Sequence, residues 1–282
     1  MSFRSLLLKA LILPWLAGCQ NIFTLPDDGA LPQPASLTST SLDGGIALHW
    51  SDEPYRASPG RFRLYRVYSA PYDLDRDLCL TPWSVEGTTV ANDFVAGALN
   101  NGGPRCFSVT AESVEGIESA RSPIREDTPR FESTSVALYA RQADDTRAGF
   151  RFWRDLDGNG NAVRSELGSV MSGAADVDLV LQRDASGRFF LVPQRAGTEI
   201  TVYGQTPVGS LHDIDVAPLT GFGRTGVEAI AGWGYVVQMT GADGFKRFGA
   251  LRVVSVGAGF VLLDWAFQND PGNPELIRVN WE

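Results

Sequence analysis

The sequence predicts an all-β protein in which a β-sandwich is followed by a second β-rich domain. Short segments alternate apolar and polar residues, as half-buried strands do. Asp-Gly, Gly-Gly and Pro-Gly pairs separate these segments, and such pairs are typical of turns. Long helical periodicity is absent, although residues 164–171 could form one or two helical turns. We divide the chain into residues 1–18, 19–34, 35–128 and 130–282.

Residues 1–18 have the features of a secretory leader. Arg4 and Lys9 supply basic charge, and an apolar run from Leu6 to Leu16 is interrupted by Lys9. A membrane span needs about 20 apolar residues, so this run is too short to cross a bilayer. The segment Leu16-Ala17-Gly18-Cys19 resembles the lipobox of bacterial lipoproteins. An ordinary signal peptide followed by a chance cysteine is the alternative.

The lipobox resemblance implies a membrane anchor and a location. In that family a diacylglycerol is attached to the sulfur corresponding to Cys19, and cleavage leaves this cysteine as the new N-terminus. Two or more acyl chains, such as palmitate, anchor stably because each buried CH₂ contributes about 0.8 kcal/mol. An Asp after the cysteine often retains family members at the inner membrane, so Gln20 is similar to outer-membrane cargo. We therefore expect a cell-envelope protein at the periplasmic side or the cell surface, with residues 20–34 as its tether.

The charge of the chain argues against nucleic-acid binding. The net charge is −9, and loss of Arg4 and Lys9 with the leader makes the mature chain more acidic. No basic run is present, whereas nucleic-acid binding relies on Lys and Arg to neutralise phosphates. No apolar stretch after the leader is long enough to span a membrane, so the lipid anchor is the membrane contact that we expect.

Residues 35–128 read as short strands. Ile46–Trp50, Phe62–Tyr68 and Cys106–Ala111 alternate, and Val114–Ser119 turns into a last strand. Together with Pro34–Leu37, the order and spacing of these segments resemble a fibronectin type III module. The resemblance implies a spacer or binding module and no catalysis.

Two cysteines remain in this first domain, Cys79 and Cys106. A disulfide is expected in an oxidising compartment, and two free buried thiols are the alternative. Arg105 stands where the fibronectin type III family usually has a Tyr, so the hydrogen bond of that Tyr would be lost. A Cys79–Cys106 bridge could compensate, since closing such a loop contributes roughly 3 kcal/mol.

Residues 130–282 are also rich in predicted strands. The candidates are Val177–Leu181, Phe189–Val192, Glu199–Tyr203, Gly234–Met239, Phe248–Val254 and Phe260–Gln268. Tyr235–Val237, Gly244–Val253 and Trp265–Gln268 resemble the closing strands of haem-scavenging β-rich lipoproteins. This resemblance implies a fold more than a ligand.

Residues 155–166 have the spacing of an EF-hand calcium loop. The expected oxygen donors are Asp155, Asp157, Asn159, Asn161 and Glu166. Gly160 would permit the sharp turn, whereas Ala162 stands where the family has a larger aliphatic residue. A strand at 149–153, rather than a helix, leads into the loop. The alternative is an Asp/Asn/Gly-rich turn without calcium, and a bound calcium ion would stiffen a loop rather than catalyse.

Candidates for catalysis are few. His49 and His212 are the only histidines, no Gly-x-Ser-x-Gly elbow is present, and Cys and His are too scarce for a zinc site. A haem site pairing His212 with Met171 or Met239 is a further alternative. Paired carboxylates of a glycosidase also stay open. Four tryptophans form either a sugar-stacking platform or part of the core: Trp153, Trp233, Trp265 and Trp281.

The leading functional hypothesis is a lipid-anchored cell-envelope protein with a non-catalytic binding or interaction role. Its partner would be a protein, a glycan or a small molecule, presented on a fibronectin-type spacer. The first alternative is an extracellular carbohydrate-active hydrolase that uses carboxylates. The second is a lipoprotein that captures haem or another cofactor.

Overall fold

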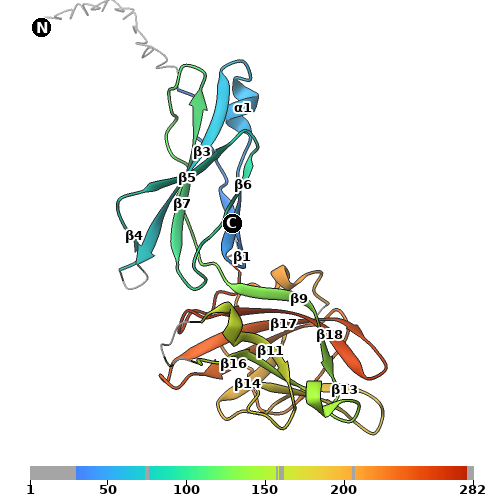
Figure 1. Cartoon of the computed structure of the whole chain (residues 1–282). Helices are drawn as coiled ribbons and strands as arrows, with labels where there is room; N and C mark the ends of the chain where they lie inside the picture. Colours follow the sequence, from blue (N-terminus) through green and yellow to red (C-terminus); the bar gives the residue numbers. More distant parts are fainter. Residues whose placement is uncertain (1–29, 74–75, 157, 159–161, 205–206, 278–282) are drawn as a thin grey trace, which may run out of the picture.

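The protein is almost entirely β-structure (Figure 1). The computed structural model describes residues 30–73, 76–156, 158, 162–204 and 207–277. Within them lie one short α-helix and three single-turn 3₁₀ helices, namely α1 (Glu53–Ala57), η1 (Asp145–Arg147), η2 (Arg164–Glu166) and η3 (Leu211–Asp213). The prediction of an all-β chain is therefore confirmed. No helix in the described ranges is long and apolar enough to cross a membrane.

The N-terminal domain is a β-sandwich of two antiparallel layers. One sheet has the order β1 (Thr38–Leu42), β2 (Gly45–His49) and β6 (Asp93–Ala96). The other has the order β4 (Leu78–Cys79), β3 (Phe62–Asp73), β7 (Arg105–Ser113) and β8 (Arg125–Asp127), with β5 (Ser84–Thr89) also paired to β3. This is the fibronectin type III-like sandwich that the sequence predicts.

Alternation along the strands builds the core of this sandwich. Ile46 and Leu48 of β2 and the following Trp50 are buried, whereas His49 is exposed, as the period of two requires. They pack against Tyr65 and Val67 of β3 and against three residues of β7, namely Phe107, Val109 and Ala111.

The segment Val114–Ser119 turns, as predicted, but it does not continue into a regular strand. Residues 114–116 form a turn in which Gly116 has a φ of +81°, and the last strand of the domain is β8. The chain after the turn follows β7 partly through side chains: the backbone N–H of Ala111 donates to the Ser119 hydroxyl at 3.0 Å. Likewise, the N–H of Val109 donates to the Ser122 hydroxyl at 3.0 Å. These hydroxyls replace some ladder bonds, so no regular strand forms.

Cys79 and Cys106 form a disulfide between β4 and β7, with their Cα atoms 5.9 Å apart. Of the two alternatives left open by the sequence, the structure has the disulfide. The neighbouring Arg105 forms an ion pair with Glu86 at 3.0 Å and donates to the Ser69 hydroxyl. A charged network therefore surrounds Arg105 beside the disulfide.

The C-terminal domain packs two five-stranded antiparallel sheets against each other. The first has the order β11 (Leu167–Met171), β10 (Gly149–Trp153), β12 (Leu179–Arg183), β13 (Phe189–Pro193) and β15 (Val227–Glu228). The second has the order β14 (Thr198–Tyr203), β16 (Gly234–Thr240), β17 (Lys246–Val256), β18 (Phe260–Gln268) and β9 (Phe131–Tyr139). Apolar side chains of both sheets meet in one core, which includes Phe150, Phe152, Leu181, Leu191, Tyr235, Val237, Leu251, Leu263 and Trp265.

The second sheet is covered on its other face as well. Leu211, Ile214 and Ala217 pack there against Val236 of β16 and Ala250 of β17. Burial on both faces explains why β16 is apolar nearly throughout rather than alternating.

All six predicted strands of this domain are present, with ends that differ by a few residues. Sequence analysis missed β9, β11 and β15. The segment at 164–171 forms the single 3₁₀ turn η2, which is followed by β11. It therefore contains one helical turn and not two.

Arg130 lies between β8 and β9, at the junction of the two domains. Its side chain is fully buried, donates to the Leu276 carbonyl and forms an ion pair with Glu132 at 3.6 Å. Burial lowers the pKa of Arg130 to about 10. The Arg130 N–H also donates to the Leu42 carbonyl at 3.1 Å, so this residue contacts both domains.

We expect that replacing both cysteines, as Cys79→Ala with Cys106→Ala, lowers the free energy of unfolding by roughly 3.5 kcal/mol. The bridge spans 27 residues, and its loss releases the loop-closure constraint on the unfolded chain. Urea unfolding of the chain from Gln20 onward measures this change. A reducing agent should destabilise the wild type and leave the double variant unchanged, and equal stability of the two would contradict the prediction.

Candidate functional site

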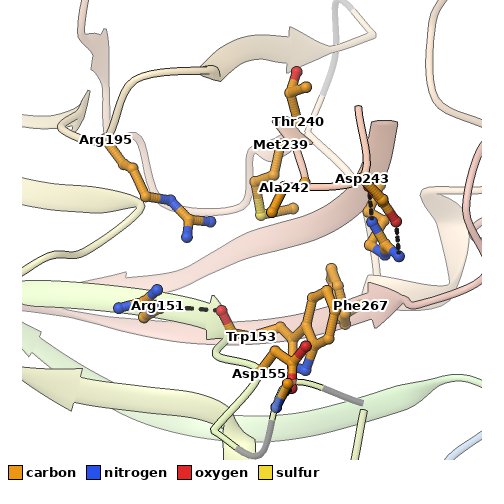
Figure 2. A pocket seen from close by; sticks show the side chains of 12 residues that line it. Arg151, Trp153, Asp155, Arg195, Met239, Thr240, Ala242, Asp243 and Phe267 are labelled. Atoms are coloured by element: carbon orange, nitrogen blue, oxygen red, sulfur yellow. Dashed lines mark hydrogen bonds and ion pairs between the residues drawn. The ribbon is translucent and has the colours of Figure 1, made fainter. Parts of the chain in front are cut away.

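A cavity with a volume of about 460 Å³ lies at one end of the C-terminal sandwich. Its walls come from β10 and the loop after it, from the β13–β14 connection, from the β16–β17 hairpin and from β18 (Figure 2). The lining residues are Arg151, Trp153, Asp155, Gly158, Arg195, Met239, Thr240, Gly241, Ala242, Asp243, Arg247 and Phe267.

The cavity forms where β10 separates from β12. Their pairing is limited to Gly149 with Val180 and Phe150 with Leu179, whereas β10 continues beside β11 as far as Trp153. The backbone of β10 beyond Phe150 therefore has no strand partner on the β12 side. Asp178, directly before β12, lies at this fork.

Asp178 joins the strands around the fork. Its fully buried carboxylate accepts the backbone N–H of Phe152 at 2.8 Å and forms an ion pair with Arg195 at 2.7 Å. Its own N–H donates to the Phe150 carbonyl at 3.0 Å, and its carbonyl accepts from the Gln194 N–H at 2.9 Å. Burial raises the pKa of Asp178, and the positive charge of Arg195 acts in the opposite direction.

Two guanidinium groups, from Arg151 and Arg195, enter the cavity from the same side (Figure 2). Arg151 donates to the carbonyls of Trp153 at 3.2 Å and Asp176 at 2.7 Å, and it pairs with the Asp176 carboxylate at 3.1 Å. Burial, and then the positive charge of Arg195, lowers the pKa of Arg151. The two cations are therefore close enough to repel each other.

Apolar side chains form another part of the wall. Phe267 and Met239 are nearly fully buried, and the rings of Trp153 and Phe267 lie 6.2 Å apart between centroids. The guanidinium of Arg247 lies over the Trp153 ring, 4.8 Å from its centroid. Arg247 is in turn held by both carboxylate oxygens of Asp243, at 3.1 and 2.7 Å.

The predicted calcium loop begins at the cavity, but the structure describes only part of it. Asp157, Asn159 and Asn161 lie outside the described residues. Asp155 accepts the N–H of Gly158, three residues on, at 2.7 Å. Glu166 is buried and accepts the N–H of Leu156 at 2.7 Å and the indole N–H of Trp153 at 3.4 Å. No group of three metal-binding side chains is found among the described residues, and calcium binding stays a prediction.

The carboxylates among the described lining residues are Asp155 and Asp243. A glycosidase needs one carboxylic acid that keeps its proton near neutral pH. The ion pair with Arg247 lowers the pKa of Asp243 and holds this group in its charged form. Asp243 is therefore unsuited to the role of the acid.

The other candidate residues do not gather at the cavity. His212 is in η3 and lies 3.2 Å from Glu132. Met239 lines the cavity, but His212 is not among the lining residues, and Met171 packs elsewhere against Ala148, Val177 and Val180.

Of the two alternatives for the tryptophans, packing in the core holds for two of them. Trp265 is in the core between the sheets, and Trp233 packs against the same core. Trp153 lines the cavity, whereas Trp281 lies outside the described residues, as does Cys19.

Arg151, Asp178 and Arg195 were not among the site residues predicted from the sequence. A signal was present for two of them, because Arg151 and Asp178 are single charges within predicted apolar strands. A buried charge needs a partner, so these residues pointed to a polar cluster. Nothing in the sequence around Arg195 sets it apart from other loop arginines.

The chain has weak similarity to several solved structures. A DUF4466 family protein from Parabacteroides merdae is similar over 84% of this chain and 99% of its own, at 10% identity and a TM-score of 0.43. The FN5 domain of Drosophila Lar matches 35% of this chain and 96% of its own, at 16% identity and a TM-score of 0.28. The third fibronectin III domain of human KIAA0343 protein matches 38% of this chain and 90% of its own, at 18% identity and a TM-score of 0.30. No family model matches the chain, and no curated protein matches it at a significant level.

We expect Arg195→Gln to make stability fall more steeply as pH rises above about 4. A carboxyl group whose pKa is higher in the folded than in the unfolded state stabilises the fold at low pH. Its contribution is complete below the unfolded pKa and is lost as the pH rises through the folded pKa. Arg195 lowers the pKa of Asp178, so its removal raises that pKa further. Each added pKa unit removes about 1.4 kcal/mol from the stability at higher pH.

Urea unfolding of wild type and Arg195→Gln at pH 4 to 8 measures the effect. The control is Arg195→Gln in an Asp178→Asn background. It should not change how stability depends on pH, because the side chain at 178 then does not titrate. Equal pH slopes for wild type and the single variant would show that Arg195 does not act through Asp178.

Proposed function

We propose that this chain is a lipid-anchored cell-envelope protein that binds a small ligand in its C-terminal domain without transforming it. The cavity between the two C-terminal sheets is the observation that carries the proposal. Small-molecule sites are concave and mostly apolar, with a few polar groups that orient the ligand, and they typically enclose about 300–1,000 Å³. The cavity combines a volume of about 460 Å³ with an aromatic wall and two inward-facing guanidinium groups.

The chemistry of the lining supports binding rather than catalysis. Among the described residues that line the cavity, none is a histidine, cysteine, serine or lysine. These side chains supply most nucleophiles and many general bases. Of the charged lining groups, Arg151 and Arg195 are suited to hold an anion, whereas Arg247 is paired with Asp243 and Asp155 is itself acidic.

The rest of the chain fits a protein that presents a binding domain. The lipobox at 16–19 supports lipidation of Cys19, and Gln20 supports the outer membrane as its location. The segment at 20–34 would act as a tether, and the fibronectin type III-like sandwich would space the C-terminal domain from the membrane. Calcium bound at 155–166 would stiffen the loop that contributes Asp155 to the cavity.

Two dyes with the same ring system test whether the cavity binds small molecules. They are the neutral N-phenyl-1-naphthylamine and the anionic 8-anilino-1-naphthalenesulfonate, titrated by fluorescence into the chain from Gln20 onward. We expect at least one dye to bind at one site per chain. Ala242→Trp should reduce that binding at least tenfold, because this exposed residue lines the cavity and an indole there would fill it.

Ala185→Trp is the matched control. Ala185 is an equally exposed residue in the turn between β12 and β13 and does not line the cavity, so its replacement should leave dye binding unchanged. The proposal fails if neither dye binds, or if both tryptophan variants bind the dyes as the wild type does.

We expect calcium to raise the thermal unfolding midpoint of the C-terminal domain by several degrees relative to chelator. A ligand at a hundred times its Kd stabilises by about 2.7 kcal/mol. The shift should disappear in Asp155→Ala and persist in Asp93→Ala, which removes an exposed aspartate of the N-terminal domain. No shift in the wild type would make residues 155–166 a turn without calcium.

A further inference from the structure

The two arginines of the cavity are held by acidic and carbonyl partners, and Arg195 is the more exposed of the two. Asp178 contacts Nη2 of Arg195, the Trp153 carbonyl contacts Nε of Arg151, and both the carbonyl and the carboxylate of Asp176 contact Nη1 of Arg151, whose side chain is 9% exposed. The side chain of Arg195 is 29% exposed, and both guanidinium groups face the cavity (Figure 2). The buried Asp178 fixes the direction of Arg195 from behind, which pre-organises the pair for a ligand.

Each of these cations has a carboxylate partner, Asp176 for Arg151 and Asp178 for Arg195, and their remaining mutual repulsion favours an anion on the cavity side. The charge of Arg195 is the second cause, after burial, that lowers the pKa of Arg151. Arginine does not lose its proton in proteins, so deprotonation does not relieve this repulsion. A carboxylate, sulfonate or phosphate group would relieve it and could accept two N–H bonds from a guanidinium.

The opposite part of the cavity is suited to a ring. Trp153, Phe267 and Met239 supply apolar surface there. The nearest carboxylate of the hairpin, Asp243, is neutralised by two bonds to Arg247 and would repel an anion little. A volume of about 460 Å³ is enough for one or two rings and an acidic group.

We infer that the ligand is a ring-bearing organic anion, whose acidic group binds between Arg151 and Arg195 and whose ring packs on Trp153 and Phe267. This inference rests on the proposed function, because it names the class of small molecule that the same cavity takes. It predicts that charge, as well as ring shape, decides affinity.

The same pair of dyes tests the role of charge, because they differ by one sulfonate. We expect the anionic dye to bind the wild type at least tenfold more tightly than the neutral dye. Arg195→Gln should weaken the anionic dye about tenfold and leave the neutral dye unchanged. Raising the salt concentration from 50 to 500 mM should weaken only the anionic dye.

Arg183→Gln is the matched control. It removes the same charge from an exposed position at the β12–β13 hairpin, outside the cavity lining, and should change neither affinity. Retained binding of the neutral dye shows that the cavity of Arg195→Gln is intact. If Arg195→Gln binds neither dye, the test rests on the wild type. Tighter binding of the anionic dye that weakens with salt then supports the inference, and equal binding of the two dyes contradicts it.

Competition with natural acids identifies the source of the ligand. Galacturonate stands for a sugar acid and benzoate for an aromatic acid, with galactose and benzamide as their neutral counterparts. Displacement of the anionic dye by one acid, but not by its neutral counterpart, supports the inference and names the class.

Other outcomes overturn the inference in distinguishable ways. If the two dyes bind with equal affinity and Ala242→Trp weakens the binding of both, the ligand need not be an anion. That outcome refutes the inference and leaves the proposed function standing. Displacement by neither acid, together with anionic-dye binding that salt does not weaken, means that the sulfonate contributes nothing to binding, which also refutes the inference. Failure of both dyes to bind refutes the inference together with the proposed function.

Discussion

The candidate site depends on one buried carboxylate at a fork between strands. Asp178 satisfies the N–H of Phe152, which has no strand partner on that side, and it holds Arg195 through an ion pair. An unpaired N–H in this position would be costly to bury, and so would an unpaired aspartate. The Asp178 carboxylate pairs with the Phe152 N–H and with Arg195, so neither group is left unpaired. The sandwich is open at this end rather than closed by a packed core. Asp178 therefore contributes both to the opening of the cavity and to the orientation of Arg195 in its wall.

The cavity marks the place where an apolar layer changes into a polar one. Through most of the C-terminal domain, side chains such as Phe152 and Leu251 fill the space between the sheets. At the end near β10 and β16, arginines occupy positions beside the aromatic rings of Trp153 and Phe267. Arginine can pack on aromatic faces and bind anions at the same time, as Arg247 does with Trp153 and Asp243. This combination makes the end of the sandwich suitable for a ligand with a ring and a charge.

The two domains are stabilised in different ways. The N-terminal sandwich has a small core, to which the Cys79–Cys106 disulfide adds a covalent link between β4 and β7. The C-terminal domain has a larger core and, in its described residues, relies on apolar packing over both faces of its second sheet. Arg130 connects them through Leu42 and Leu276, and as a buried charge it depends on Glu132 and on backbone carbonyls.

The sequence by itself determined the fold class, because alternation of period two and turn residues are local features. Strands such as Phe260–Gln268, the exposure of His49 and the joint presence of Cys79 and Cys106 in one domain follow from such features. The resemblance of Leu16-Ala17-Gly18-Cys19 to a lipobox is likewise a feature of the linear sequence. Only the tertiary structure decided that Arg151 and Arg195 share a cavity, since they lie 44 positions apart in chain numbering and belong to β10 and to the β13–β14 connection. It likewise decided that Trp265 belongs to the core while Trp153 lines the cavity, because burial depends on how two sheets pack rather than on the pattern within one strand.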